Sequence, residues 1–437
     1  MPTVGVARSA NRGCPIAPLE APEKMAFTGA VSNGILQMTS VVGSMQAPSL
    51  DVDPWKIETL LNPWEFHHLL RETGPVVQFS RYGHYAVARY DQVKSVLSDW
   101  SHFGSRYGIG ISDIRAPGSW REAGPIVEAD PPNHTQVRNV LSKIISPKVV
   151  RAWSKAFHAE SAVVIDRACA LGQLNAAKDI SEAYILKVFP ESLGLTPHAE
   201  NMVIVGDFNF NSMGPRNALF RESEKKLEGI SDWLEAARSR EAIEPGSFAD
   251  QVYQAEDAGE LAKGTASGLM LSMYRGGTDT TISGLSSAIL LLAERPELWA
   301  TLRKDRSLLK MVFGEAIRLE TPIQSYFRTA MSDVEIEGVL IPQDARVQVF
   351  LGSANRDPRQ WNDPDKFDLN RAMTGHVSFG FGIHQCLGQV IARMEAESVL
   401  TAMLDRIERI ELTGPAIYRP VNHLRTLQDL PIRVVPA

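Results

Sequence analysis

The sequence of 437 residues contains few cysteines, only Cys14, Cys169 and Cys386. They are odd in number, lie far apart and form no CxxC pair, so the sequence indicates neither a disulfide framework nor a zinc site of that kind. We therefore expect a reducing, cytoplasmic compartment.

A clear membrane span is also missing. The stretch 25–45 is hydrophobic, but Asn33, Gln37 and several Ser, Thr and Gly residues interrupt it. We interpret residues 1–50 as a poorly ordered N-terminal extension, with Met45 as an alternative start of the protein.

Excess positive charge is absent. The formal net charge is -6, which argues against nucleic-acid binding and favours a small-molecule partner. There is no internal repeat, no coiled-coil heptad and no nucleotide-binding Gly-rich fingerprint. The length exceeds that of a usual single domain, unless the fold wraps one large core around a buried cofactor.

Residues 379–388 read FGFGIHQCLG and precede an apolar-periodic run at 389–404. Cys386 lies in this Gly-rich loop just before a predicted helix, whose N-terminus can stabilise a thiolate. Glycines at 380, 382 and 388 allow tight turns and let the backbone approach a flat cofactor. The pattern indicates an axial metal ligand; the alternative is a buried free cysteine in an ordinary strand-to-helix turn.

The remaining periodicity predicts a mainly α protein with a small β region. Residues 62–74 form a helical pattern, and the runs 76–79 and 85–88 predict a β-hairpin. From 148 to about 301 the pattern is mostly helical, and short β-like runs such as 347–351 follow.

Residues 105–123 predict a long Gly-rich loop, and such loops inside compact domains are usually functional. Arg106, Ser112 and Asp113 lie in it. They are candidate site residues or, alternatively, solvated loop polars.

His134 and Arg138 follow at the start of a predicted helix. Their spacing of four places them on one face, where both can contact one anion, although such a pair is often an ordinary surface pair. The segment 208–210 gathers two phenylalanines, which predict core packing or a substrate wall.

A predicted long helix at 261–293 contains Gly276 and Gly277 in its middle. Each glycine costs on the order of 1 kcal/mol relative to alanine. Glycine suits the approach of a flat group or small molecule, and the adjacent Asp279 and Thr280 can bend the helix and hold water. A close helix–helix contact is the equal alternative.

The loop at 379–388 resembles, position for position, the haem-binding loop of the cytochrome P-450 family, the haem-thiolate monooxygenases. The other motifs follow in the order of that family from about Asp51 to the end. The resemblance implies a triangular-prism fold, mainly α with a small β region, in which residues 51–437 form a single catalytic domain around a buried haem b.

The resemblance also implies roles for individual residues. Cys386 would be the thiolate ligand of the haem iron. The same loop contributes Phe379, Gly382 and His384, and the haem propionates would be held by His384 with three further residues: His134, Arg138 and Arg328. A structural set would be formed by Glu315, Arg318 and Arg371.

Asp279 and Thr280 match the family's acid–alcohol pair, which delivers protons during oxygen activation. Haem-thiolate proteins that use peroxide or rearrange substrates commonly alter this pair, so a peroxygenase or isomerase is a weaker alternative. The expected partners are O2, a small aromatic substrate and an iron–sulfur ferredoxin with its NAD(P)H-dependent reductase.

Several stretches, among them 324–328 and 351–358, resemble the bacterial enzymes that oxidise para-substituted benzoates, including O-demethylation of 4-methoxybenzoate. This resemblance implies a carboxylate anchor and aromatic walls, for which the candidates here are Arg106, Ser112, Phe210, Met213, Ser272, Arg275 and Tyr326.

The sequence departs from that pattern at Leu271, where a second helix arginine is expected, and at Arg275, where a small serine is usual. Either Arg275 takes over the carboxylate, or the pocket prefers a neutral methoxyphenol. Two further interpretations stay open: the substrate is a secondary metabolite such as a terpenoid or macrolide, or the protein is a haem-based sensor without turnover.

Overall fold

The computed structural model describes residues 45–195, 198–372 and 374–437. Its helices in chain order are α1 (Ile57–Leu61), α2 (Trp64–Thr73), α3 (Tyr90–Ser98), α4 (Asn133–Ile144), α5 (Pro147–Leu171), η1 (Ala177–Glu182), α6 (Ala183–Leu193), α7 (Ala199–Ser212), α8 (Ala218–Glu228), α9 (Ser231–Ala237), η2 (Arg240–Ala242), α10 (Phe248–Asp257), α11 (Thr265–Gly276), α12 (Asp279–Ala293), α13 (Pro296–Lys304), η3 (Arg306–Leu308), α14 (Leu309–Glu320), α15 (Leu351–Ala354), η4 (Gly382–His384) and α16 (Gln389–Arg406).

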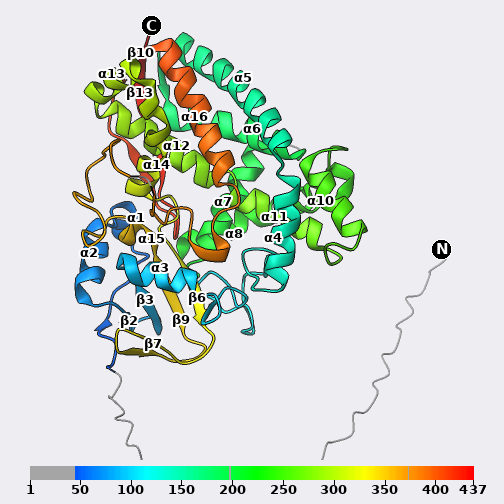
Figure 1. The fold of residues 1–437 in the computed structure, drawn as a ribbon, viewed down its shortest axis with the longest axis vertical. Coiled ribbons are helices and arrows are strands. Elements are labelled where there is room, and N and C mark those ends of the chain that lie inside the picture. The colour runs from blue at the N-terminus through cyan, green and yellow to red at the C-terminus, as the bar shows by residue number, and fades with distance from the viewer. Residues whose placement is uncertain (1–44, 196–197, 373) are drawn as a thin grey trace, which may run out of the picture. The chain divides into compact units, whose positions relative to one another are not determined.

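The strands of the described residues are β1 (Ser49–Leu50), β2 (Val77–Phe79), β3 (His84–Val87), β4 (Phe103–Gly104), β5 (Gln173–Asn175), β6 (Ser325–Ala330), β7 (Val334–Ile336), β8 (Val339–Ile341), β9 (Arg346–Phe350), β10 (Ile407–Leu412), β11 (Ile417–Arg419), β12 (Thr426–Asp429) and β13 (Pro431–Pro436). The largest sheet has the order β1-β2-β3-β9-β6-β4, in which β6 pairs antiparallel with β9. Smaller sheets join β10-β13-β5, β11-β12 and β7-β8. Figure 1 shows this largest sheet at one end of the described part of the chain and the long helices at the other.

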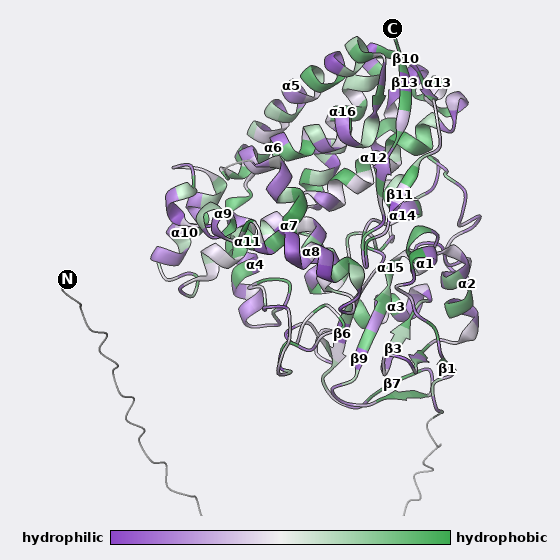
Figure 2. Ribbon diagram, turned by 180° about the vertical axis from the view of Figure 1, so that it is seen from behind, coloured by the Kyte–Doolittle hydropathy of each residue, from purple (hydrophilic) through white to green (hydrophobic). Residues whose placement is uncertain are grey.

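The core is centred on α12. Every residue of this helix except Thr280 is buried, and the helix packs against α14, while α16 packs against α5. The outer helices, such as α5, carry both hydrophilic and hydrophobic residues along their length (Figure 2), as expected for helices with one face on a core. Within the described ranges, no helix combines the length and apolar character that crossing a bilayer requires.

The mainly α class with a small β region is confirmed. The predicted hairpin is also confirmed, since β2 and β3 pair antiparallel with Val77 opposite Ala86. The long helix predicted at 261–293 differs from the structure: it begins at Thr265 and is interrupted between Gly276 and Asp279.

The predicted extension 1–50 overlaps the described part of the chain. Ser49 and Leu50 form β1 and pair in parallel with β2, so the sheet begins ahead of Asp51. Residues 1–44 of the predicted extension lie outside the described residues.

Candidate active site

The cysteine loop is folded by hydrogen bonding and by glycine. The backbone N–H of Cys386 donates to the carbonyl oxygen of Phe379 at 2.8 Å. Gly380 and Gly382 adopt φ angles of 71° and 70°, which favour glycine. A Cβ on Gly382 would lie 2.5 Å from the carbonyl oxygen of Leu97, so this glycine also lets the loop lie against α3.

The sulfur of Cys386 has a mixed environment. Its side chain is reached by solvent, yet the protein atoms around it desolvate the sulfur and raise the pKa of the thiol. The backbone N–H groups of Gly388 and Gln389, together with the positive charges of Arg138 and Arg393, oppose this rise. Amides and cations that favour a thiolate are what a metal-ligating cysteine needs.

Two histidines meet beside this loop. The ring centroids of His134 and His384 are 4.3 Å apart, and within the described chain the Nε2 atom of each has no hydrogen-bond partner. Asp130 lies 3.9 Å from His384 Nε2 and accepts from the N–H of Ser105. Burial, with the positive charges of His384, Arg138 and Arg328, lowers the pKa of His134 to about 4, while Asp130 opposes the shift.

The predicted arginines lie in the same cluster. Arg138 donates to the carbonyl oxygen of Gln385 at 2.6 Å, and its charge acts on both histidines. The guanidinium of Arg328, which is 4% exposed, stacks 4.7 Å from the ring centroid of Tyr326. Two cations and two unpartnered imidazole nitrogens fit the carboxylates of the haem that the resemblance implies.

The two glycines at the break between α11 and α12 have different surroundings. A Cβ on Gly277 would lie 1.9 Å from the ring of Phe189, whereas nothing lies within 4 Å of a Cβ on Gly276. Gly277 therefore serves a close helix–helix contact, and Gly276 faces open space. The hydroxyl of Thr280 donates to the carbonyl oxygen of Gly276 at 2.9 Å.

Asp279 is buried next to this break. Its carboxyl accepts from the hydroxyl of Thr278 at 3.2 Å and is 6% exposed. Burial raises its pKa to about 7; Arg419 opposes the shift, and the negative charges of Asp207 and Glu182 add to it. Arg419 itself pairs with Asp207.

An apolar cluster gathers side chains from the end of α7, the turn at 421–424 and β6. Phe210 and Met213 at the end of α7 pack with Val421 and Leu424, and the partly buried side chains against them are Ile109, Ile323 and Tyr326. The structure thus brings together the three predicted wall residues. Sequence reasoning missed Val421 and Leu424, because hydrophobicity carries no signal that this turn packs on α7.

Asn422 and His423 hold that turn in place. The side-chain amide of Asn422 donates from Nδ2 to the carbonyl oxygen of Asn211 at 2.9 Å. Its Oδ1 accepts from the side chain of Asn217, at the start of α8. The N–H of Asn422 donates to Oδ1 of Asn211 at 3.0 Å. The turn therefore connects the C-terminal β-region to the end of α7 and the start of α8.

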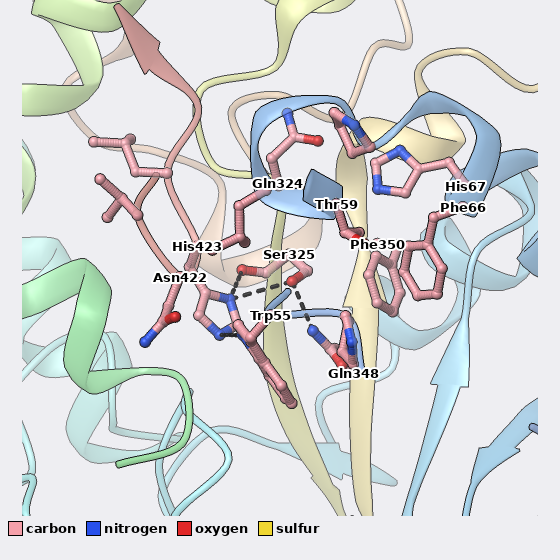
Figure 3. A pocket seen from close by; sticks show the side chains of 15 residues that line it. Trp55, Thr59, Phe66, His67, Gln324, Ser325, Gln348, Phe350, Asn422 and His423 are labelled. Carbon is pink, nitrogen blue, oxygen red and sulfur yellow. Dashed lines mark hydrogen bonds between the residues drawn. The ribbon is translucent and has the colours of Figure 1, made fainter. Parts of the chain in front are cut away.

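Figure 3 shows the other side of the same turn, where His423 meets Trp55 and Ser325. The indole N–H of Trp55 donates to Nε2 of His423 at 3.2 Å, so Nδ1 carries the proton and donates to the carbonyl oxygen of Ser325 at 2.7 Å. Burial lowers the pKa of His423 to about 4, in agreement with a neutral ring. Ser325 alternates with Tyr326 along β6, so this small pocket lies on the opposite face of the strand from Tyr326 and Arg328.

The predicted loop residues Arg106 and Ser112 each contact another polar side chain. Arg106 is half exposed, and within the described residues its ion pair is with Asp130, at 3.8 Å. The hydroxyl of Ser112 lies 3.2 Å from that of Ser119. Asp130 holds the backbone N–H groups of 105 and 106, which draws this part of the loop toward the histidine cluster.

A buried arginine that the sequence analysis did not single out lies on the other side of the loop. Arg121 pairs with Glu128 at 3.1 Å, both side chains being about 5% exposed, and donates to the carbonyl oxygen of Asn209 at 2.9 Å. The indole of Trp120 donates to the carbonyl oxygen of Ser212 at 2.7 Å. These contacts fix the loop to the C-terminal end of α7.

Arg275 lies beside this ion pair. Its backbone oxygen accepts from Asn209 at 3.1 Å, and burial lowers the pKa of its guanidinium to about 10. Arg121 adds to that lowering, while Glu128 opposes it. Ser272, one turn earlier, donates to the carbonyl oxygen of Gly268 at 2.9 Å.

The predicted structural set meets in the interior. Arg318 donates to both oxygens of Glu315, at 2.7 and 2.9 Å, and neither side chain is exposed. Arg371 donates to Glu315 at 3.0 Å. Their role in folding and haem retention stays a prediction.

Comparisons with known proteins bear on this site. A family model described as Cytochrome P450 matches residues 185–411. The chain is 40% identical over 392 residues to cytochrome p450 CYP199A2 from Rhodopseudomonas palustris, covering 89% of this chain and 95% of the relative. It is 29% identical over 403 residues to 6-deoxyerythronolide B hydroxylase from Saccharopolyspora erythraea, covering 89% and 98%. The solved structure of cytochrome P450 CYP109Q5 from Chondromyces apiculatus aligns with a TM-score of 0.73 at 30% identity, covering 89% and 99%.

Proposed function

This chain belongs to the cytochrome P450 family, the monooxygenases with a thiolate-ligated haem iron, and we propose that it oxidises a para-substituted benzoate by hydroxylation or O-demethylation. When bound, the haem supplies the activation of O2 and the insertion of one oxygen atom into the substrate. In this proposal Cys386 ligates the iron, and the residues that hold the propionates are His134, Arg138, Arg328 and His384.

The apolar cluster gives the aromatic ring its place. Phe210, Met213 and Tyr326 provide a ring-binding surface and exclude water, and the open space at Gly276 lets the reacting group approach the haem.

Asp279 and Thr280 handle protons in this proposal. The carboxyl of Asp279 has a pKa of about 7, which suits a group that gains and loses a proton near neutral pH. The hydroxyl of Thr280, the one residue of α12 that is not buried, holds a water or a proton at the open side of the helix.

The charges around Arg275 support the proposal that the substrate bears a carboxylate. Arg121 is paired with Glu128. Among the described residues Arg275 has no ion pair of its own: burial and the charge of Arg121 lower the pKa of its guanidinium, and the charges of Glu128 and Glu122 offset this only in part. A desolvated cation is costly unless it is paired, and a substrate carboxylate supplies the pair. Because Arg106 is half exposed and paired with Asp130, we assign the carboxylate to Arg275.

Members of this family receive electrons from redox partners. We infer that the partner of this chain is an iron–sulfur ferredoxin, which is reduced in turn by an NAD(P)H-dependent reductase.

A titration of the ferric protein tests the substrate class. The Soret band is followed while 4-methoxybenzoate or, separately, 4-methoxyphenol is added to wild type, Arg275→Leu and the control Arg106→Gln. We expect the acid to bind wild type, and Arg275→Leu to weaken the acid about 10- to 100-fold without weakening the phenol, since a hydrogen bond to a charged group contributes about 1.5–3 kcal/mol. A response of wild type to the phenol alone would reject the benzoate assignment.

A further inference from the structure

Two arginines from different helices contact residues of the cysteine loop or next to it: Arg138 donates to Gln385, and Arg393 donates to Gln389. Arg138 comes from α4 and Arg393 from α16, and both are half buried. The charges of both arginines interact with that of Cys386. The two arginines nevertheless differ in what else they contact.

Arg138 belongs to the cluster described above. It donates to Gln385, and its charge acts on His134 and His384. Its place is therefore explained by the propionates. The charges of Arg328, Asp130 and Arg138 act on His384.

Arg393 contacts the cysteine loop from the side of α16. Its guanidinium lies 4.6 Å from the ring centroid of Phe379, and Nη1 donates to Oε1 of Gln389 at 2.9 Å. Both contacted residues also hold the cysteine: Phe379 accepts the N–H of Cys386, and the N–H of Gln389 points to the sulfur. Arg393 therefore contacts a residue at each end of the loop.

We propose that Arg393 is a positioning residue that tunes the haem through Cys386: its charge stabilises the electron-rich sulfur, and its stacking fixes Phe379. The inference rests on the thiolate-ligated haem of the family and is independent of the substrate class. One-electron reduction of the ferric site adds one negative charge, with the electron supplied by the redox partner or, in the experiment, by an electrode. A nearby cation stabilises the more negative state, so Arg393 raises the reduction potential.

Spectroelectrochemical titration of the substrate-free holoprotein tests this proposal. The variants are Arg393→Gln, which removes the charge, and Arg393→Lys, which keeps it. The matched control is Arg409→Gln, since Arg409 is 60% exposed in β10 and paired with Glu411. We expect a lower potential for Arg393→Gln than for wild type, with Arg393→Lys close to wild type and Arg409→Gln unchanged.

An unchanged potential in Arg393→Gln would overturn the proposal. So would equal shifts in Arg393→Gln and Arg393→Lys, because stacking without charge would then account for the effect. If Arg393→Gln did not retain haem, Arg393→Met, which keeps an apolar contact with Phe379 without the charge, gives the same comparison. The potential does not depend on substrate turnover, so failure here is distinct from failure of the benzoate assignment.

Discussion

The carboxyl of Asp279 occupies the space that a side chain at Gly206 would need. A Cβ on Gly206 would lie 1.6 Å from Oδ2 and 2.4 Å from Cγ of Asp279. The first turn of α12 is therefore in direct contact with the backbone of α7. Because residue 206 is a glycine, the buried carboxyl of Asp279 fits against α7 at the residue before Asp207, which pairs with Arg419.

Gly206→Ala is expected to destabilise the protein and displace the Asp279 carboxyl. Overpacking costs about 1–3 kcal/mol, and the better helix propensity of alanine returns up to about 1 kcal/mol. The measurement is the free energy of unfolding of Gly206→Ala with and without Asp279→Ala. In the Asp279→Ala background the cost should largely vanish; equal costs in both backgrounds would contradict the contact.

The raised pKa of Asp279 predicts a pH-dependent stability. Burial shifts its pKa from the ordinary value of 3.8 to about 7 in the fold, so the folded chain holds a proton that the unfolded chain releases. The contribution of this carboxyl is fully present below the unfolded pKa and is lost as the pH rises through about 7. Between pH 3.8 and about 7 the free energy of unfolding of wild type should therefore fall relative to that of Asp279→Asn. Chemical denaturation at several pH values measures this difference. Parallel curves for the two proteins would mean that Asp279 titrates normally.

Gly276 and Gly277 form a matched pair for substitution. Gly277→Ala places a methyl group 1.9 Å from the ring of Phe189 and should lower the stability by about 1–3 kcal/mol. Gly276→Ala meets nothing within 4 Å and should keep or raise the stability. Thermal unfolding measures both. Because the methyl group of Gly276→Ala enters the proposed substrate space, it should weaken the Soret response to 4-methoxybenzoate, and an unaltered response would place the ligand elsewhere.

Glu315→Gln should be among the most damaging single changes. It leaves Arg318, which is fully buried, without its carboxylate and costs about 3–5 kcal/mol, as expected for a broken buried pair. The control is Glu411→Gln, whose partner Arg409 is 60% exposed, and which should cost about 0–1 kcal/mol. Chemical denaturation and the haem content of the purified variants check both values. Similar costs for the two substitutions would contradict the structural role of the interior pair.

The sequence was most informative where local chemistry decides the structure. The glycines around Cys386 and the turn between the runs at 76–79 and 85–88 predicted a tight loop and a hairpin, and each depends on residues close in the chain. Gly276 and Gly277 marked an anomaly in the helix. Which of the two faces the pocket depends on Phe189 in α6, and periodicity cannot predict that contact.

Other parts of the site depend on long-range packing. Asn422 meets Asn211 across 211 residues of chain, with no pattern in either segment that predicts the pair. Arg121 reads as a solvated loop residue until Glu128 and the end of α7 bury it. The contacts of Arg106 with Asp130, through its backbone N–H and its guanidinium, likewise join segments that no local pattern connects, and the substrate role of Arg106 stays a prediction.

The turn that carries Val421 and Asn422 also determines when the pocket can form. It supplies part of the apolar cluster and donates hydrogen bonds to α7. The strand β13, which follows it, pairs with β5. During synthesis α7 and α8 leave the ribosome long before this turn exists. The growing chain therefore has no finished binding site until this turn has been made, and capture of a substrate follows the synthesis of the turn.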